Sequence, residues 1–119
     1  MDLRRAKGKR GDWFARVDGD QEDLPCVHKF WVRPTKEDAQ QRMRYRDPHA
    51  MPGNPTWDRF IEGIRTKGRV ILADDPPIVP DGSGGFVRGR YIAVFEASEV
   101  EIDGTTLWFT FGDRLMDLR

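Results

Sequence analysis

The stretch that decides the fold spans residues 90–111 and reads RYIAVFEASEVEIDGTTLWFTF. Aromatic and β-branched residues, which favour strands, are frequent in it. Within it, the pair Asp103-Gly104 is a strong signal for a two-residue turn between antiparallel strands. We therefore predict a meander of three connected strands, over Arg90–Ala97, Val100–Asp103 and Thr106–Phe111.

The segment before the meander predicts a helix that leads directly into a strand. We expect the helix over about residues 56–67, with Thr56 as its N-cap and Gly68 at its end. Residues 69–73, RVILA, then form a short apolar strand. The apolar stripe of the helix has i, i+3, i+4, i+7 spacing, which predicts packing on a sheet, and consists of Trp57, Phe60, Ile61 and Ile64.

The N-terminal third predicts a hairpin, with strands over Trp13–Val17 and Leu24–Val32 joined by the polar turn DGDQED. The second strand carries large groups on both faces, which indicates a central position in the sheet. Residues 35–44, TKEDAQQRMR, predict a weak exposed helix. Residues 45–56 contain three prolines and a glycine, so we expect a loop there.

Together these elements predict an α+β domain that is strand-rich, with a mainly antiparallel sheet or a small open barrel packed by one main helix. The length of 119 residues suits a single domain. Residues 1–10 are basic and lack an apolar period, so we interpret them as a flexible tail and residues 11–119 as the domain. Such an architecture serves many functions, so function has to be argued from particular sites.

Composition excludes several classes of protein. No apolar run is long enough to span a bilayer, and the first ten residues lack the apolar centre of a secretory signal. The single cysteine, Cys26, cannot form an intramolecular disulfide, as is typical of a reducing compartment. We therefore expect a soluble cytoplasmic protein without a role at membranes. Twenty basic and twenty acidic residues cancel, so the molecule has no strong overall field.

Charge is nevertheless segregated along the chain, and this suggests nucleic-acid binding as the first candidate function. Trp13, Trp31, Tyr45 and Trp108 offer stacking surfaces for bases. The residues predicted to contact phosphates are Arg4, Arg5, Lys7, Lys9, Arg10, Arg65, Lys67, Arg69, Arg88 and Arg90. The competing interpretation, which we favour for the individual residues, places three of these aromatic side chains in the core and pairs the arginines with carboxylates.

Trp108 supports a second hypothesis, a protein-interaction or homodimeric module. Its neighbours Leu107 and Phe109 should point to the opposite face of their strand. Both faces of the strand then carry large apolar groups, and one of them needs a helix, a second sheet or a partner to cover it.

Cys26 and His28 support a third hypothesis, a small enzyme. Alternate residues of a strand point the same way, and a thiol beside an imidazole can become a nucleophile. A single cysteine in an apolar strand more often acts as a small hydrophobic residue. The sequence also shows no third catalytic residue at a characteristic spacing that would orient the histidine. We therefore rank catalysis below binding.

The loop over residues 74–89, DDPPIVPDGSGGFVRG, is the last candidate feature. A segment of this length and composition is usually a functional lid, a binding loop or disordered. Its GSGG stretch lacks the lysine and helix of a phosphate-binding loop, and two histidines with one cysteine do not match a zinc pattern. The sequence thus predicts neither a cofactor nor a metal.

Overall fold

The computed structural model describes residues 3–8, 13–34 and 42–119, which form one eight-stranded sheet and one α-helix. Helix α1 spans Pro55–Lys67, and a 3-10 turn, η1, spans Lys29–Trp31. No helix in these ranges is long and apolar enough to cross a lipid bilayer. The strands are β1 (Ala6–Gly8), β2 (Phe14–Val17), β3 (Leu24–His28), β4 (Val32–Pro34), β5 (Met43–Asp47), β6 (Arg69–Asp74), β7 (Arg90–Asp103) and β8 (Thr106–Asp117).

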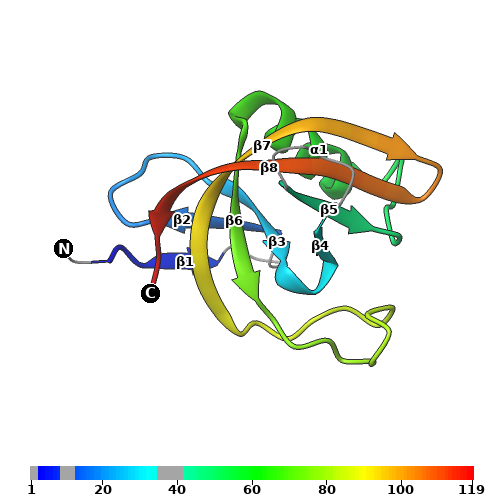
Figure 1. Cartoon of the computed structure of the whole chain (residues 1–119), viewed down its shortest axis with the longest axis horizontal. Coiled ribbons are helices and arrows are strands. Elements are labelled where there is room, and N and C mark those ends of the chain that lie inside the picture. The colour runs from blue at the N-terminus through cyan, green and yellow to red at the C-terminus, as the bar shows by residue number, and fades with distance from the viewer. Residues whose placement is uncertain (1–2, 9–12, 35–41) are drawn as a thin grey trace.

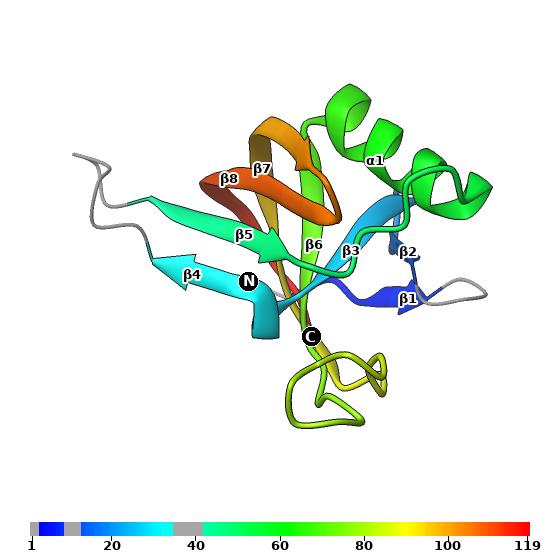
Figure 2. The same ribbon diagram turned by 90° about the vertical axis from the view of Figure 1, so that its right-hand side faces the viewer.

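The strands lie in the order β1-β2-β3-β6-β7-β8-β5-β4 and form an open, strongly twisted sheet (Figures 1 and 2). All neighbours are antiparallel except β3 and β6. A parallel pair needs a long crossover, which η1, β4, β5 and α1 supply between these two strands. The predicted fold class is confirmed: α+β, mainly antiparallel, with one main helix. The position of β3 between β2 and β6 also confirms it as a central strand.

The part of the predicted tail that the structure describes differs from the expectation. Ala6–Gly8 form β1, which pairs with β2 through the register Ala6↔Val17. Beyond β1, Arg4 forms an isolated bridge with Leu118, close to the end of β8. Edge strands are held by backbone hydrogen bonds and tolerate charged side chains, so a basic segment without apolar period can still pair.

Strand β5 is a second difference. The expected loop over residues 45–56 and the last two residues of the expected helix over 35–44 both overlap Met43–Asp47, which is a strand between β4 and β8. Tyr45 explains why, because this strand buries its side chain in the core to 2% exposure. Residues 35–41 of the expected helix lie outside the described residues.

In the meander, the hairpin turn is confirmed, with Asp103 opposite Thr106. The first two predicted strands are one continuous strand, β7, with an irregular register near Glu99, whose φ is 55°. A bulge of this kind bends a strand without ending it. In the sequence alone, the residues at the bulge look like a break between two separate strands. Strand β8 also continues beyond Phe111 to Asp117.

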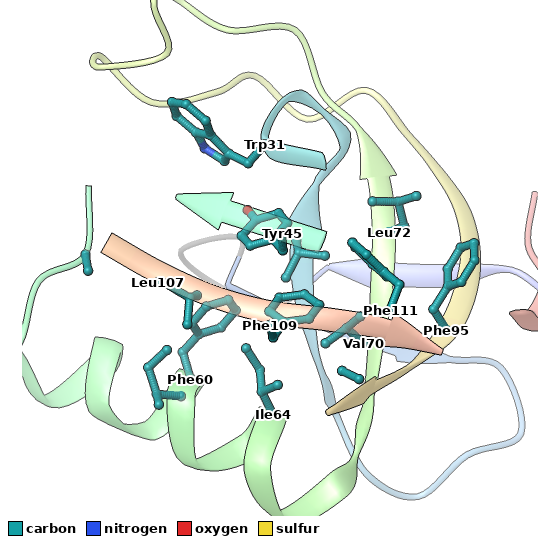
Figure 3. Packing of buried hydrophobic residues seen from close by; sticks show 14 of the residues in the cluster. Trp31, Tyr45, Phe60, Ile64, Val70, Leu72, Phe95, Leu107, Phe109 and Phe111 are labelled. Atoms are coloured by element: carbon teal, nitrogen blue, oxygen red, sulfur yellow. The ribbon is translucent and has the colours of Figure 1, made fainter. Parts of the chain in front are cut away.

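Helix α1 covers one face of the sheet and supplies much of the core. All four residues of its predicted stripe are buried, which confirms both the stripe and its packing. Figure 3 shows Phe60 and Ile64 pointing from the helix toward Phe109 of β8. Burying side chains of this size contributes about 1.5–3 kcal/mol each.

The N-cap of the helix lies two residues earlier than the sequence indicates. Asn54, not Thr56, is the N-cap: its Oδ1 accepts hydrogen bonds from the backbone N–H groups of Thr56 at 3.0 Å and Trp57 at 3.2 Å, and Pro55 follows at the first helical position. We expect Asn54→Ala to cost about 1 kcal/mol of the free energy of unfolding in urea denaturation. Thr56→Ala is the control, and an equal loss there would mean that the cap is wrongly placed.

Candidate functional site

A cavity of about 380 Å³ is lined by the residue before β2, by β3, η1 and β5, by the β5–α1 connection with α1, and by the loop between β6 and β7. This volume lies within the range of about 300–1,000 Å³ that is usual for small-molecule sites. Aromatic side chains dominate its lining. The lining residues are Trp13, Cys26, His28, Trp31, Tyr45, Asp47, His49, Met51, Trp57, Phe60, Gly82, Ser83, Gly85 and Phe86.

One side of the cavity is formed by Trp13, Trp57 and Phe60, which we call the helix wall. The Trp13 ring lies edge-on to Trp57, with centroids 5.7 Å apart, and edge-on to Phe60 at 5.5 Å. Edge-to-face contacts of this kind fix the orientation of each ring. Trp57 and Phe60 belong to the hydrophobic core, whereas Trp13 is only half-buried.

The other side is formed by Trp31, Phe86, His28 and His49, which we call the loop wall. The His28 imidazole is stacked on Phe86 with centroids 4.0 Å apart and planes inclined by 14°. Trp31 lies 6.0 Å from Phe86 and 5.5 Å from His49, measured between ring centroids. Among the described residues, ring contacts stay within each wall and do not bridge the two. We call the cavity that these two groups of rings line the slot.

Tyr45 and Asp47 of β5 add polar groups to the lining of the slot. The Tyr45 hydroxyl accepts a hydrogen bond from the backbone N–H of His28 at 3.2 Å. Its own proton is not used in this bond and can be donated to another acceptor. Burial raises the pKa of this hydroxyl well above its ordinary value, which keeps it a donor. Asp47 accepts from the backbone N–H of His49 at 2.8 Å, and burial raises the pKa of its carboxyl despite that bond.

A buried carboxylate behind the loop wall holds His28 in place. Asp75 Oδ2 lies 2.8 Å from His28 Nδ1 and accepts from Arg88 Nη1 at 2.7 Å, and its Oδ1 accepts from the Gly89 N–H at 2.7 Å. Burial by itself raises the pKa of this carboxyl, but the two hydrogen bonds from His28 and Gly89 and the charge of Arg88 outweigh it and hold the pKa below its ordinary value. The ionised carboxylate thus orients the His28 ring from behind.

The loop over residues 74–89 has a defined conformation and builds part of the cavity. Pro77 bridges Phe86, and the Ile78 N–H donates to the Gly85 carbonyl at 3.0 Å, so the loop folds back on itself like a hairpin. At its tip Gly82 lies against the Trp31 ring. Of the interpretations that the sequence left open, a binding loop fits this arrangement.

The basic residues predicted to contact phosphates do not gather at the cavity. None of the eight in the described ranges lines it, and Lys9 and Arg10 lie outside those ranges. Arg88 is paired with Asp75 inside the domain. Arg5, Lys7, Arg65 and Arg69 are exposed. The remaining three form ion pairs on the surface: Arg4 with Asp20, Lys67 with Glu22, and Arg90 with Asp74.

Trp108 lies away from the cavity on the outer face of β8. As its strand alternation predicts, Leu107 and Phe109 beside it are fully buried on the opposite face. Trp108 itself is half-buried, with the guanidinium groups of Arg44 and Arg46 of β5 lying 4.9 Å and 5.5 Å from its ring centroid. These neighbours from the same sheet cover part of the ring.

Cys26 and His28 both line the cavity, but their side chains contact different partners. The Cys26 thiol, 3% exposed, accepts from Arg88 Nη1 at 3.4 Å, whereas the His28 imidazole is directed to Asp75. Asp75 is the third group that no spacing revealed, because it follows His28 by 47 residues. Within the described part of the chain, no three His, Cys, Asp or Glu side chains gather as a metal site requires.

Sequence reasoning identified Trp13, Trp31 and Tyr45 as aromatic candidates, and the structure brings all three to one cavity. It missed Phe86, whose only signal was its place in a loop rich in proline and glycine, and Asp47, which ends strand β5 where the sequence predicted a loop. Comparison with known proteins found no matching family model, no matching curated protein and no matching solved structure. The function is therefore argued from the cavity itself.

Proposed function

We propose that the domain is a binding module that takes one unstacked nucleobase, from a nucleotide or a single-stranded nucleic acid, between the helix wall and the loop wall. The observation that carries this proposal is the lining of the slot, which combines two groups of aromatic rings with hydrogen-bonding groups. Proteins commonly hold unstacked bases by stacking them on aromatic side chains while polar groups contact the base edges.

The polar groups suit the edge of a base. Tyr45 offers a proton and Asp47 offers carboxylate oxygens, so together they match an edge that presents both an acceptor and a donor. Stacking against aromatic side chains contributes about 1–3 kcal/mol per base and does not depend strongly on base identity. Affinity would thus come from the walls, and selectivity from these polar groups.

The phosphates of such a ligand would stay outside the cavity. Among the residues that the structure describes, its lining contains no lysine or arginine, and the basic side chains in it are His28 and His49. Binding driven by phosphate contacts weakens steeply with salt, whereas stacking on aromatic rings does not. The proposal therefore differs from a general phosphate-binding surface in a measurable way: the affinity should depend only weakly on salt.

We expect Trp13→Ala and Phe86→Ala each to weaken binding about 5–150-fold, because each removes a stacking surface from one wall. Both side chains are only half-buried, so the fold should tolerate their loss better than that of Trp57 or Phe60. The measurements are calorimetric titration with adenosine monophosphate and fluorescence anisotropy with a labelled single-stranded hexanucleotide, each in a salt series.

Trp108→Ala is the matched control, because it removes a half-buried tryptophan from outside the cavity. Its affinity should equal that of the unmodified protein. Absence of binding by the unmodified protein to both ligands at low salt would overturn the proposal. So would a loss in Trp108→Ala as large as in the wall variants.

A further inference from the structure

The negative charge of Asp47 is the feature of the cavity that binding of a neutral nucleobase leaves unexplained. Its carboxylate lines the cavity, is half-buried and receives one backbone hydrogen bond, from His49. Within residues 3–8, 13–34 and 42–119, no lysine or arginine forms an ion pair with it. Removing a carboxylate from water without a cation is costly, so a group of this kind in a cavity indicates a ligand that compensates it.

The walls favour the same kind of ligand. Trp13, Trp31 and Trp57 all line the cavity, and the faces of tryptophan rings attract cations more strongly than those of other aromatic residues. This attraction grows when the cation is desolvated, as it is between two aromatic surfaces. A carboxylate and tryptophan rings around one slot therefore point together to a positive charge.

We propose that the base selected by this cavity is positively charged: an N-alkylated heteroaromatic ring, such as adenine methylated at N1, held between the tryptophans with its charged edge toward Asp47. This inference rests on the proposed function and names its ligand class. The ring stacks on both walls, its amino group donates to the Asp47 carboxylate, and a ring nitrogen accepts from the Tyr45 hydroxyl.

A compact methylated ammonium group fits the site less well, although aromatic cages commonly bind such groups. The hydroxyl of Tyr45 is already an acceptor toward His28, so it needs a ligand that can accept its proton. A quaternary ammonium offers neither donor nor acceptor, whereas a heteroaromatic ring offers both.

The test compares two isomers that carry the same methyl group. At neutral pH 1-methyladenosine is protonated and carries a positive charge, whereas N6-methyladenosine is neutral, so the two differ by one proton and in the position of the methyl group. We expect calorimetric titration to give about tenfold or tighter binding of the cation, and Asp47→Asn to abolish that preference while the neutral isomer keeps its affinity. Asp74→Asn, which alters a half-buried aspartate outside the cavity, should leave both affinities unchanged.

A second readout separates ligand binding from a structural role of Asp47. Burial raises the pKa of the Asp47 carboxyl, which means that the folded protein disfavours its charged form. Asparagine can still accept the His49 hydrogen bond but carries no charge, so Asp47→Asn should raise the Tm of the ligand-free protein at neutral pH. A purely structural residue would instead lower the Tm when replaced.

The pH dependence has a definite sign. Binding of the cationic isomer should weaken as the pH falls through the raised pKa of Asp47, because the protonated carboxyl no longer attracts it. Tyr45, His28 and His49 face the same carboxylate. The neutral isomer should show a flatter profile.

Each outcome separates this inference from the proposed function. Equal binding of the two isomers, unchanged in Asp47→Asn, would overturn the charge preference and leave base binding intact. Binding of choline or trimethyllysine with no binding of either nucleoside would overturn both. A lower Tm together with equal loss of both isomers in Asp47→Asn would assign the residue a structural role and overturn the inference.

Discussion

Replacing Asp75 with alanine is expected to lower the free energy of unfolding by about 3–5 kcal/mol, because the Arg88 guanidinium then loses its buried carboxylate. The Asp75 side chain is fully buried and also accepts from His28 and from the Gly89 N–H. In the variant, Arg88, His28 and the Gly89 N–H all lose their common acceptor and face the space that the carboxylate occupied. Urea denaturation followed by circular dichroism measures the loss.

Asp74 provides the matched control for this prediction. It precedes Asp75 in the chain, is nearly half-exposed, and lies 3.9 Å from Arg90 on the surface. Surface pairs of this kind contribute about 0–1 kcal/mol, so Asp74→Ala should change stability little. Similar losses in the two variants would mean that burial of the Asp75 carboxylate is not what stabilises this part of the fold.

The role of Asp75 also predicts how the free energy of unfolding depends on pH. The pKa of Asp75 lies below its ordinary value of 3.8, so the carboxyl binds fewer protons in the folded than in the unfolded protein. Its contribution to stability is therefore complete above the ordinary pKa and is lost as the pH falls through the lowered one. Below about pH 4, the stability of the unmodified protein should approach that of Asp75→Ala; a gap that stays constant in acid would contradict this.

The elements that sequence predicted correctly are those that local chemistry determines. The stripe of α1 follows from residues three and four positions apart, and the hairpin at Asp103-Gly104 follows from its two turn residues. The β2–β3 hairpin likewise depends on adjacent runs and the polar turn between them. Its second strand, predicted over Leu24–Val32, ends at His28, where the 3-10 turn η1 begins. In each case the decisive contacts join neighbours in the chain.

The elements that sequence did not predict depend on distant partners. Met43–Asp47 lies beside prolines and looks like a loop, but β8 pairs with it and the core accepts Tyr45. The basic Ala6–Gly8 becomes a strand because β2 offers a free edge. No pattern within either segment carries this information, since the partner supplies the hydrogen bonds.

The candidate site lies between these two cases. Its aromatic residues could be identified as stacking candidates by type, and the loop over 74–89 by its length and composition. Their convergence could not be predicted, because the cavity joins segments from Trp13 to Phe86 through the sheet. The pairing of His28 with Asp75 is equally non-local, and the role of Asp47 emerges only once its surroundings are known.

Gly82 tests whether the loop wall is a fixed surface. Its φ is +80°, and a Cβ built there lies 2.7 Å from Trp31 Cζ2 and 2.8 Å from Phe30 Cε1. Trp31 is 5% exposed and packed against Phe30 and Phe86, so it has little room to move. We expect Gly82→Ala to cost about 1–3 kcal/mol through overpacking alone, with backbone strain added, and to weaken base binding by displacing the loop.

Gly85 is the control that isolates the crowding. It lies in the same loop, also lines the cavity and has φ +87°, but a Cβ there meets no atom within 4 Å. Gly85→Ala therefore carries the backbone strain without the clash, and the difference between the two variants in urea denaturation measures how firmly Trp31 is held. Equal losses of stability and affinity in the two variants would mean that the loop moves easily enough to accommodate the added methyl group at Gly82. The second stacking surface would then form only when the ligand binds, because the loop wall would not be rigid beforehand.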